Sequence, residues 1–463
     1  MEEDEDAIQK EKKDVNDLSK YNLDDYDEEN SQPAGALGAF SNIKGLTYYK
    51  SNDEDPFITL DDDAKKEDEK EEREELEILP SDNLLVAAKT EEEISQLEVY
   101  VYDDKEENLY VHHDLMLPSF PLCLEWMNFA PNKPELSNSF GNYIAVGTFE
   151  PEIEIWSLDV IDGLYPDAIL GKVDKGKSAK EFAMPVGTGK KKKKQLKAND
   201  EHHVDAVLSL SWNKSHRNIL ASGSADHTVK LWDLNTSKSV RSFNPHNEKV
   251  QSVEWNEKES TILLTGGFDQ SVRTFDTRSP NDGVGCNVSS DVEVCKWDPW
   301  NAHNFYVSTE NGIVQQYDAR NLSSIPQGEK INNSSNAIFT LSAHDGAVSA
   351  LDINPHFKGC LATGGTDKSV KIWNVDQSND LTNVSLTTSR DLGVGSVFSV
   401  NFSPDDPLVL AAAGSKAKMQ VWDIGTNPGA RSAFAGRIND FKPRERSNEG
   451  IIGVEDDNED ENE

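Results

Sequence analysis

Two consecutive stretches decide the fold: HVDAVLSLSWNKSHRNILASGSADHTVKLWDLN (residues 203–235) and HNEKVQSVEWNEKESTILLTGGFDQSVRTFDTR (residues 246–278). They align without a gap. In each stretch a His stands nine residues before a Trp, and an aromatic residue followed by Asp lies twenty residues after that Trp. Each contains three apolar runs with period-two alternation, and a tight polar turn separates the second run from the third. The pattern predicts a repeating unit of short antiparallel β-strands.

The same unit recurs along the chain with looser matches. Six units end in an aromatic residue, and three further strand-like runs lie between residues 83 and 117. A repeat of about 40 residues that builds one small sheet is typical of a propeller, in which sheets surround an axis. The sequence therefore predicts an all-β, seven-bladed β-propeller, and it resembles the WD-repeat family. The six closing aromatic residues are Trp156, Trp232, Phe275, Tyr317, Trp373 and Trp422.

In the WD-repeat family a His, a Ser or Thr, an Asp and the closing Trp form a hydrogen-bonded tetrad inside one blade. The resemblance implies such tetrads here, because they satisfy polar groups whose burial without partners would cost roughly 1–3 kcal/mol each. A Ser/His/Asp set also occurs in hydrolases, but its repetition at one spacing favours a structural role. The matching residues are His203, Ser222, Asp226 and Trp232; His344, Thr363, Asp367 and Trp373; and His246, Thr265 and Asp269, with Phe275 in the Trp position.

Charge divides the chain into three parts. The net charge is −38, and residues 1–80 hold 27 acidic against 10 basic residues with few apolar ones, which predicts an acidic, mostly disordered arm. We expect the propeller over residues 81–440 and an acidic disordered tail over residues 441–463. The acidic balance argues against a general nucleic-acid-binding surface, which would be basic.

A propeller protects its sheet edges by joining its first and last blades. The first blade has only three strand-like runs in the sequence, so we expect a further strand from elsewhere to complete it. The candidates are SAFAGR (residues 432–437) and the segment around PFITL (residues 56–60).

A basic insertion at residues 170–200 interrupts the repeat. It contains five consecutive lysines, which repel one another and are therefore unusual in a plain loop. We expect this run to act as a nuclear import signal or to contact RNA phosphates; the alternative is a solvated loop without a specific role. The lysines are Lys190, Lys191, Lys192, Lys193 and Lys194.

No sequence pattern indicates an enzyme, a metal site or a cofactor. The four cysteines lie in different units without CxxC spacing, which favours reduced packing residues. The adjacent histidines at 112–113 and 202–203 are expected to face opposite sides of a strand, and so not to share a metal. No apolar run is long enough for a membrane span, and the acidic N-terminal region does not fit a secretory signal. These observations predict a non-enzymatic scaffold.

A closer resemblance covers residues from about 21 to 425. It rests on YNLDDYDEE, GLTYYKSNDEDPFITL, PSDNLLVAAKTEE, LEVYVYDDKEENLYVHHDLML, GNYIAVGTFEPEIEIWSLD and the lysine run before HVDAVLSLSWN. These segments are similar to the periodic tryptophan proteins, a WD-repeat family of ribosome assembly. The resemblance implies a factor of the nucleus and nucleolus that is needed for large-subunit precursors and ribosomal RNA processing. Its implied partners are large-subunit assembly factors and precursor ribosomal RNA, with the protein acting as a monomer within a large particle.

Two other functions remain open at this point. One is a chromatin adaptor linked to ribosomal RNA gene transcription, because acidic rims suit basic histone tails or ribosomal proteins. The other is a substrate receptor of a cullin-type ubiquitin ligase. The segments 275–278 (FDTR) and 317–320 (YDAR) resemble the WDxR box, which makes Arg278 and Arg320 candidates for docking on an adaptor. The alternative is that each Arg pairs with a local acid.

Overall fold

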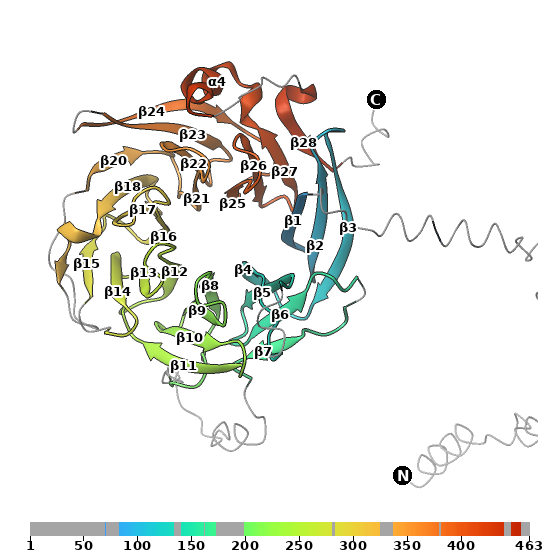
Figure 1. The fold of residues 1–463 in the computed structure, drawn as a ribbon, viewed down its shortest axis with the longest axis vertical. Coiled ribbons are helices and arrows are strands. Elements are labelled where there is room, and N and C mark those ends of the chain that lie inside the picture. The colour runs from blue at the N-terminus through green and yellow to red at the C-terminus, as the bar shows by residue number, and fades with distance from the viewer. Residues whose placement is uncertain are drawn as a thin grey trace, which may run out of the picture. The chain divides into compact units, whose positions relative to one another are not determined.

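The structure is a computed structural model that describes residue 70 and residues 83–133, 140–161, 163–172, 199–279, 283–324, 337–378, 381–438 and 446–454. The chain divides into two units, Met1–Ile78 and Leu79–Glu463. In the second unit seven antiparallel sheets are arranged as blades around an axis (Figure 1). The predicted seven-bladed β-propeller is therefore confirmed.

Blades 1 to 4 follow one another in chain order, and neighbouring strands in sequence pair within each sheet. Blade 1 contains β1 (Asn83–Glu91), β2 (Ile94–Asp103) and β3 (Asn108–Leu117). Blade 2 contains β4 (Pro121–Met127), β5 (Tyr143–Thr148), β6 (Ile153–Ser157) and β7 (Ala168–Leu170). Blade 3 contains β8 (Val207–Trp212), β9 (Ile219–Ser224), β10 (Val229–Asp233) and β11 (Lys238–Phe243). Blade 4 contains β12 (Val250–Trp255), β13 (Ile262–Gly267), β14 (Ser271–Asp276) and β15 (Val284–Asn287), with β19 (Ser323–Ser324) at its edge.

Blades 5 to 7 complete the ring, and short helices follow some of their strands. Blade 5 contains β16 (Val292–Trp297), β17 (Asn304–Thr309), β18 (Ile313–Asp318) and β20 (Phe339–Ser342). Blade 6 contains β21 (Ala350–Ile353), β22 (Cys360–Gly364), β23 (Val370–Ser378) and β24 (Leu381–Arg390). Blade 7 contains β25 (Val397–Phe402), β26 (Val409–Gly414), β27 (Met419–Asp423) and β28 (Ile451–Gly453). The helices are η7 (Ala319–Asn321), η8 (Ile424–Thr426), α4 (Pro428–Phe434), η9 (Ala435–Arg437) and η10 (Ser447–Gly450).

The core lies between neighbouring blades. The inner strand of a blade, which is the strand nearest the axis, packs against the second strand of the blade before it. At Gly223 in β9 an added Cβ would lie 2.7 Å from Val253 and 3.0 Å from Val250, both in β12. Gly266 in β13 has the same close relation to β16. Glycine is therefore needed where the next inner strand approaches, because a side chain would collide with it.

The turn between the second and third strands is tight in several blades, as the sequence pattern predicts. His227, Gln270, Lys368 and Ala417 occupy equivalent positions in these turns, with φ between 57° and 70°. A positive φ at one central residue lets a short hairpin follow the twist of its two strands.

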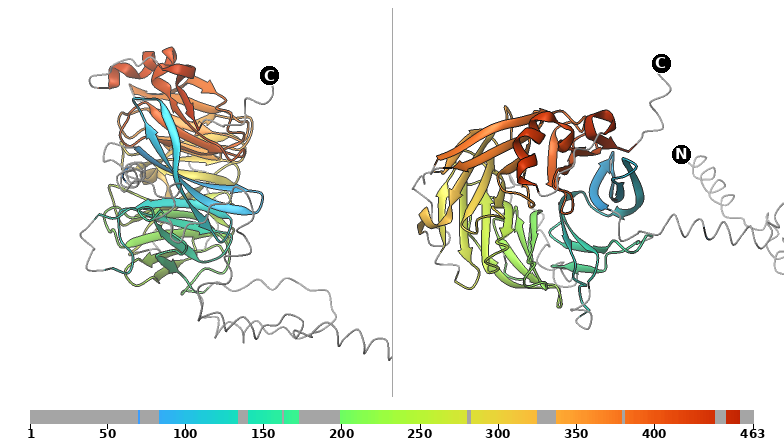
Figure 2. Two further views of the ribbon diagram at one scale, coloured as in Figure 1. Left: turned by 90° about the vertical axis from the view of Figure 1, so that its right-hand side faces the viewer. Right: turned by 45° about the horizontal axis from the view of Figure 1, so that its top comes forward.

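The C-terminal region joins the ring in an unexpected way. Residues 432–437 lie in α4 and η9 and not in a strand, so the prediction that they complete blade 1 is wrong (Figure 2). A helix forms here because Asn427 caps it, Pro428 stands in its first turn, and Phe434 is buried beside Phe357, with ring centres 5.3 Å apart. The segment 56–60 lies outside the described residues.

The last strand of the ring is β28, which pairs with β27 and completes blade 7. It falls within residues 441–463, so the prediction of a disordered tail is wrong for this part of the chain. Ile452 is 4% exposed and packs with apolar residues of blades 1 and 7. This burial holds the short segment in place. The sequence did not indicate it, because the residues around it are mostly acidic.

A buried arginine fastens blade 7 to blade 1. Arg446 Nε donates to Asp423 Oδ2 at 2.7 Å, and Arg446 Nη1 donates to the carbonyl oxygen of Asp104 at 2.7 Å. The side chains of Arg446 and Asp423 are 3% and 2% exposed. Beside this cluster Tyr102 and Leu109 of blade 1 pack with apolar residues of blade 7. Among the described residues, the two blades thus meet through side chains and share no sheet.

Candidate functional site

Four side chains of blade 3 form one continuous chain of hydrogen bonds. His203 Nε2 lies 2.7 Å from Ser222 Oγ, and Trp232 Nε1 donates to the same oxygen at 2.8 Å. On its other side, His203 Nδ1 lies 3.0 Å from Asp226 Oδ2. The ionised Asp226 can only accept, so Nδ1 of the neutral His203 donates to it, and Nε2 of His203 accepts from the Ser222 hydroxyl. The arrangement satisfies each of these polar groups inside the blade.

The burial of this tetrad removes its Ser from catalysis. His203, Ser222 and Trp232 are 0% exposed, and the indole N–H occupies the oxygen that would have to attack a substrate. Burial lowers the pKa of His203, so the imidazole is neutral. Burial alone would raise the pKa of Asp226, but hydrogen bonds from His203 and Thr228 hold it well below its usual range. An ionised carboxylate therefore holds a neutral imidazole in the core.

Blades 4 and 6 repeat this geometry. In both, the His Nε2 lies 2.7–2.9 Å from a Thr hydroxyl, and the His Nδ1 lies 2.9–3.0 Å from an Asp oxygen. Trp373 Nε1 donates to Thr363 Oγ1 at 2.9 Å, whereas Phe275 has no such donor. The structure thus brings together every predicted tetrad residue. These are His246, Thr265 and Asp269 in blade 4, and His344, Thr363, Asp367 and Trp373 in blade 6.

Each cluster has a fifth member that the sequence patterns did not reveal. Thr228, two positions after Asp226, donates to Asp226 Oδ1 at 2.6 Å and lies 3.1 Å from His203 Nδ1. Ser271 and Ser369 occupy the same position in blades 4 and 6. The available signal was an Asp-x-Ser/Thr triplet at the start of the third strand in all three units.

A second set of polar side chains links one blade to the next; we call it the inter-blade ladder. In each case the residue before the large apolar residue near the end of an inner strand (Trp126, Trp212, Trp255 or Ile353) accepts the backbone N–H of the corresponding aromatic residue in the next blade. The sequence patterns did not reveal these pairs, because the partner of each acceptor is a backbone N–H. The pairs are Glu125 with Trp212 (2.8 Å), Ser211 with Trp255 (3.1 Å), Glu254 with Trp297, and Asp352 with Phe402 (2.7 Å).

An ion pair continues the ladder at blade 5, where the acceptor position holds a lysine. Lys296 Nζ lies 3.3 Å from Asp352 Oδ1 and 4.0 Å from Glu254 Oε1. The charge of Asp352 raises the pKa of Lys296 and outweighs the opposing effect of burial. Lysine has no acceptor, so it bridges two carboxylates instead of receiving an N–H.

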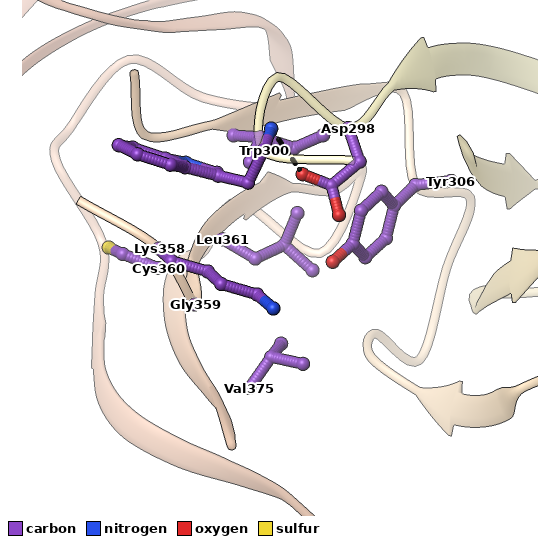
Figure 3. Close-up of a pocket in the computed structure, with 9 residues that line it drawn as sticks. Asp298, Trp300, Tyr306, Lys358, Gly359, Cys360, Leu361 and Val375 are labelled. Carbon is purple, nitrogen blue, oxygen red and sulfur yellow. Dashed lines mark hydrogen bonds between the residues drawn. The ribbon is translucent and has the colours of Figure 1, made fainter. Parts of the chain in front are cut away.

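A small pocket opens between blades 5 and 6 (Figure 3). Asp298, Tyr306 and Lys358 point toward the same space, and Trp300, which is 39% exposed, lies beside them. Burial raises the pKa of Asp298, whose Oδ1 accepts the backbone N–H of Trp300 at 2.9 Å. The nearby Cys360 is 1% exposed and burial raises its pKa, so the pocket holds no reactive thiolate.

The histidine pair at 112–113 differs from its prediction. The ladder between β2 and β3 passes from Val99 opposite His113 to Tyr100 opposite Val111, so His112 is the extra residue of a β-bulge. The bulge turns both rings to one side, with their Nδ1 atoms 2.8 Å apart, and the expectation of opposite faces is wrong. Among the described residues, however, no group of three or more His, Cys, Asp or Glu side chains is placed to hold a metal.

The four thiols are free, and burial raises the pKa of each. Within the part of the chain that the structure describes, no helix is long and apolar enough to cross a membrane.

The two candidate docking arginines pair with the acids that end the preceding strands, two residues earlier in the sequence. Arg278 Nη2 lies 2.6 Å from Asp276 Oδ2, and Arg320 Nη2 lies 2.6 Å from Asp318 Oδ2. Both side chains are exposed, at 73% and 62%, and each hydrogen bond lowers the pKa of the Asp. Each Arg thus pairs with a local acid, as the alternative expected, and docking of these exposed residues on an adaptor stays a prediction.

The lysine run, Lys190 to Lys194, lies outside the described residues. The chain re-enters the described part at Asn199, whose carbonyl oxygen accepts a hydrogen bond from Lys230 Nζ in β10. Lys230 also donates to Ser242 Oγ at 2.8 Å and is 0% exposed. The basic insertion is therefore anchored on blade 3 at its C-terminal end.

Comparison with known proteins identifies the family. The family described as WD domain, G-beta repeat matches residues 193–233, 237–276 and 335–374. A Saccharomyces cerevisiae protein named Periodic tryptophan protein 1 is 34% identical over 94% of this chain and 80% of its own length. The chain belongs to the periodic tryptophan protein 1 family. This membership confirms the resemblance that the non-repeat segments indicated.

Further relatives agree with this family. The Periodic tryptophan protein 1 homolog of Drosophila melanogaster is 30% identical over 80% of this chain and 73% of its own length. An uncharacterized WD repeat-containing protein of Schizosaccharomyces pombe is 49% identical over 95% of this chain and 79% of its own. A chain in the crystal structure of a mitotic checkpoint complex shares the fold, with a TM-score of 0.50, 16% identity, and coverage of 72% of this chain and 84% of that chain.

Proposed function

We propose that this member of the periodic tryptophan protein 1 family is a non-enzymatic scaffold of ribosome biogenesis. It assembles early large-subunit precursors in the nucleolus and supports the processing of ribosomal RNA. The observation that carries this proposal is the family membership, which extends over nearly the whole chain and not only over the repeats. The resemblance to that family implies the role in ribosome assembly.

The geometry of the propeller supports a scaffold. Tetrads inside the blades and the ladder between them use buried polar groups to hold the ring rigid, so its rim loops keep fixed positions. In this proposal the rim binds large-subunit assembly factors, and the lysine run contacts precursor ribosomal RNA or directs nuclear import. The acidic arm shields basic partners until they are placed.

Affinity purification of the tagged full chain from cells tests the proposal. We expect precursor ribosomal RNA and large-subunit assembly factors to co-purify, and depletion of the protein to increase unprocessed precursor RNA. Normal RNA processing after depletion, or co-purification without any precursor RNA, would contradict the assembly role.

The acidic charge also supports a second candidate, a histone-binding adaptor. A net charge of −38 favours basic tails of histones as well as basic ribosomal proteins. Nucleosomes recovered in the same purification without ribosomal precursors would favour this adaptor. A cullin-type receptor has weaker support, because Arg278 and Arg320 already pair with Asp276 and Asp318. Replacing both arginines by Ala should leave the co-purified proteins unchanged if these pairs are only structural.

A further inference from the structure

Ser279 lies in the turn that follows β14 of blade 4, and it is exposed to solvent. Its backbone N–H donates to the carbonyl oxygen of Asp276 at 2.9 Å, which holds the turn in place. Pro280, the next residue in the sequence, lies outside the described part of the chain. Proline-directed protein kinases phosphorylate a Ser that stands directly before Pro when its hydroxyl is accessible. Ser279 meets both conditions.

The sequence contains one further Ser-Pro pair, Ser403 with Pro404, and the structure distinguishes the two. Ser403 is partly buried, and its Oγ accepts the backbone N–H groups of Asp405 and Asp406 at 3.2 and 3.0 Å. The hydroxyl of Ser403 is therefore engaged in its own turn. The two acids that follow it would also repel a phosphate.

Two arginines lie beside Ser279. Arg278, the residue before it, has a side chain that is 73% exposed and pairs with Asp276. Arg241, in β11 of blade 3, donates from Nη1 to the carbonyl oxygen of Thr277 at 2.6 Å and lies 3.5 Å from that of Arg278. The second of these carbonyl groups shares its peptide unit with the N–H of Ser279. The Arg241 guanidinium is thus next to the backbone of Ser279.

The charges around Ser279 suit a phosphate. Arg241 and Arg278 carry two positive charges, and Asp276 opposes them with one negative charge. A phosphoserine carries about −1.5 to −2 charges at pH 7, and its bonds to arginine are charge-assisted and often bidentate. A phosphate on Ser279 would therefore compete with Asp276 for Arg278.

We propose that Ser279 is a phosphorylation site for a proline-directed protein kinase and that its phosphate binds Arg241 and Arg278. In the reaction the Oγ of Ser279 forms a bond to the γ-phosphorus of ATP, and the bond from that phosphorus to the β–γ bridging oxygen breaks. ADP leaves, and the kinase takes up the hydroxyl proton. The phosphate then joins blade 4 to Arg241 of blade 3 and occupies Arg278, which is no longer available to an adaptor. This inference does not depend on the proposed role in ribosome assembly.

Phosphorylation of the purified full chain tests the site. The probe is ATP with a purified cyclin-dependent kinase, and mass spectrometry locates the phosphate. We expect phosphate on Ser279 in the wild type, loss of this phosphate in Ser279→Ala, and no loss of it in Ser403→Ala. Absence of phosphate from Ser279, when the same kinase modifies a standard peptide, would overturn the proposal. Equal phosphorylation of wild type and Ser279→Ala would do the same.

Phosphorus NMR of the phosphorylated chain tests the contact with the arginines. A phosphoserine titrates near pH 6, and pairing with arginine favours its dianion, so we expect a midpoint at least about half a pH unit lower. Arg241→Ala should return the midpoint toward 6. Arg390→Ala is the matched control, because Arg390 pairs with Glu449 at the end of β24, and it should leave the midpoint unchanged. A midpoint near 6 in the wild type, or one that a folded Arg241→Ala variant does not shift, would overturn the proposed contact.

Discussion

The hydroxyl at the centre of each tetrad serves two partners at once. In blade 6, Thr363 Oγ1 contacts His344 Nε2 at 2.7 Å and accepts from Trp373 Nε1 at 2.9 Å. Thr363→Ala should leave both buried groups without a partner and lower the free energy of unfolding by about 2–4 kcal/mol. Urea unfolding followed by tryptophan fluorescence measures this change.

Blade 4 offers a control for this prediction with the same substitution. Thr265 is as buried as Thr363, but it serves only His246 in its tetrad, because Phe275 has no N–H to donate. Thr265→Ala should therefore cost about 1–2 kcal/mol less than Thr363→Ala. Equal losses in the two blades would show that the indole hydrogen bond contributes little to stability.

The tetrad carboxylates make stability depend on pH in the acid range. Burial alone would raise the pKa of Asp269, but hydrogen bonds from His246 and Ser271 lower it to about 2. Because the pKa in the unfolded chain is about 3.9, the stabilisation is complete above roughly pH 4 and is lost as the pH falls through about 2. Asp269→Asn should therefore lose about 2 kcal/mol at neutral pH, and this difference from wild type should shrink between about pH 4 and pH 2. Unfolding curves at several pH values test it; a difference independent of pH would contradict the assigned role.

Among the elements, the C-terminal strand depends on one side chain for its attachment to blade 1. Arg446→Ala should leave the buried Asp423 carboxylate unpaired and lower the free energy of unfolding by about 3–5 kcal/mol. Hydrogen exchange should become faster in β27 and β28, where the strand pairing would open. Arg390→Ala is the control: Arg390 pairs with Glu449, which is 81% exposed, so its loss should cost less than about 1 kcal/mol. Similar losses for the two variants would argue against a special role for Arg446.

The elements that the sequence predicted well are those whose signals are local. The tetrad residues His203, Ser222 and Asp226 lie within one unit, so their spacing is fixed by the length of one hairpin. The contact of Arg446 with Asp104 joins residues 342 positions apart, and no local pattern marks it. The bulge at His112 was also not predicted, because the rule that successive side chains alternate between the two faces assumes a regular strand.

The inter-blade ladder escaped prediction for a different reason. Its acceptors, such as Glu125 and Asp352, bind a backbone N–H of the next blade, and a backbone group has no sequence signature. The aromatic–Asp pair Tyr102–Asp103 was visible in the sequence and would have assigned β2 as a third strand.

For the whole molecule, the lysine run is the basic feature that contrasts with the acidic charge. Replacing Lys190 to Lys194 by Gln should reduce nuclear accumulation or association with ribosomal precursors, because five cationic contacts are lost. Fluorescence imaging and sedimentation of cell extracts measure the two effects. Replacing Lys175, Lys177 and Lys180, which are dispersed in the same insertion, is the control and should have little effect. Unchanged behaviour of the Gln variant in both assays would remove the run from the mechanism.

The arginine between blades 1 and 7 has a consequence for the order of events during synthesis. Blades 2 to 6 each draw their paired strands from nearby sequence and are able to fold as the chain emerges, since local contacts form first. Blade 7 can be joined to blade 1 by Arg446 only after the ribosome has synthesised residue 446. Until then the growing chain is an arc of blades whose first and last members are not yet joined by Arg446.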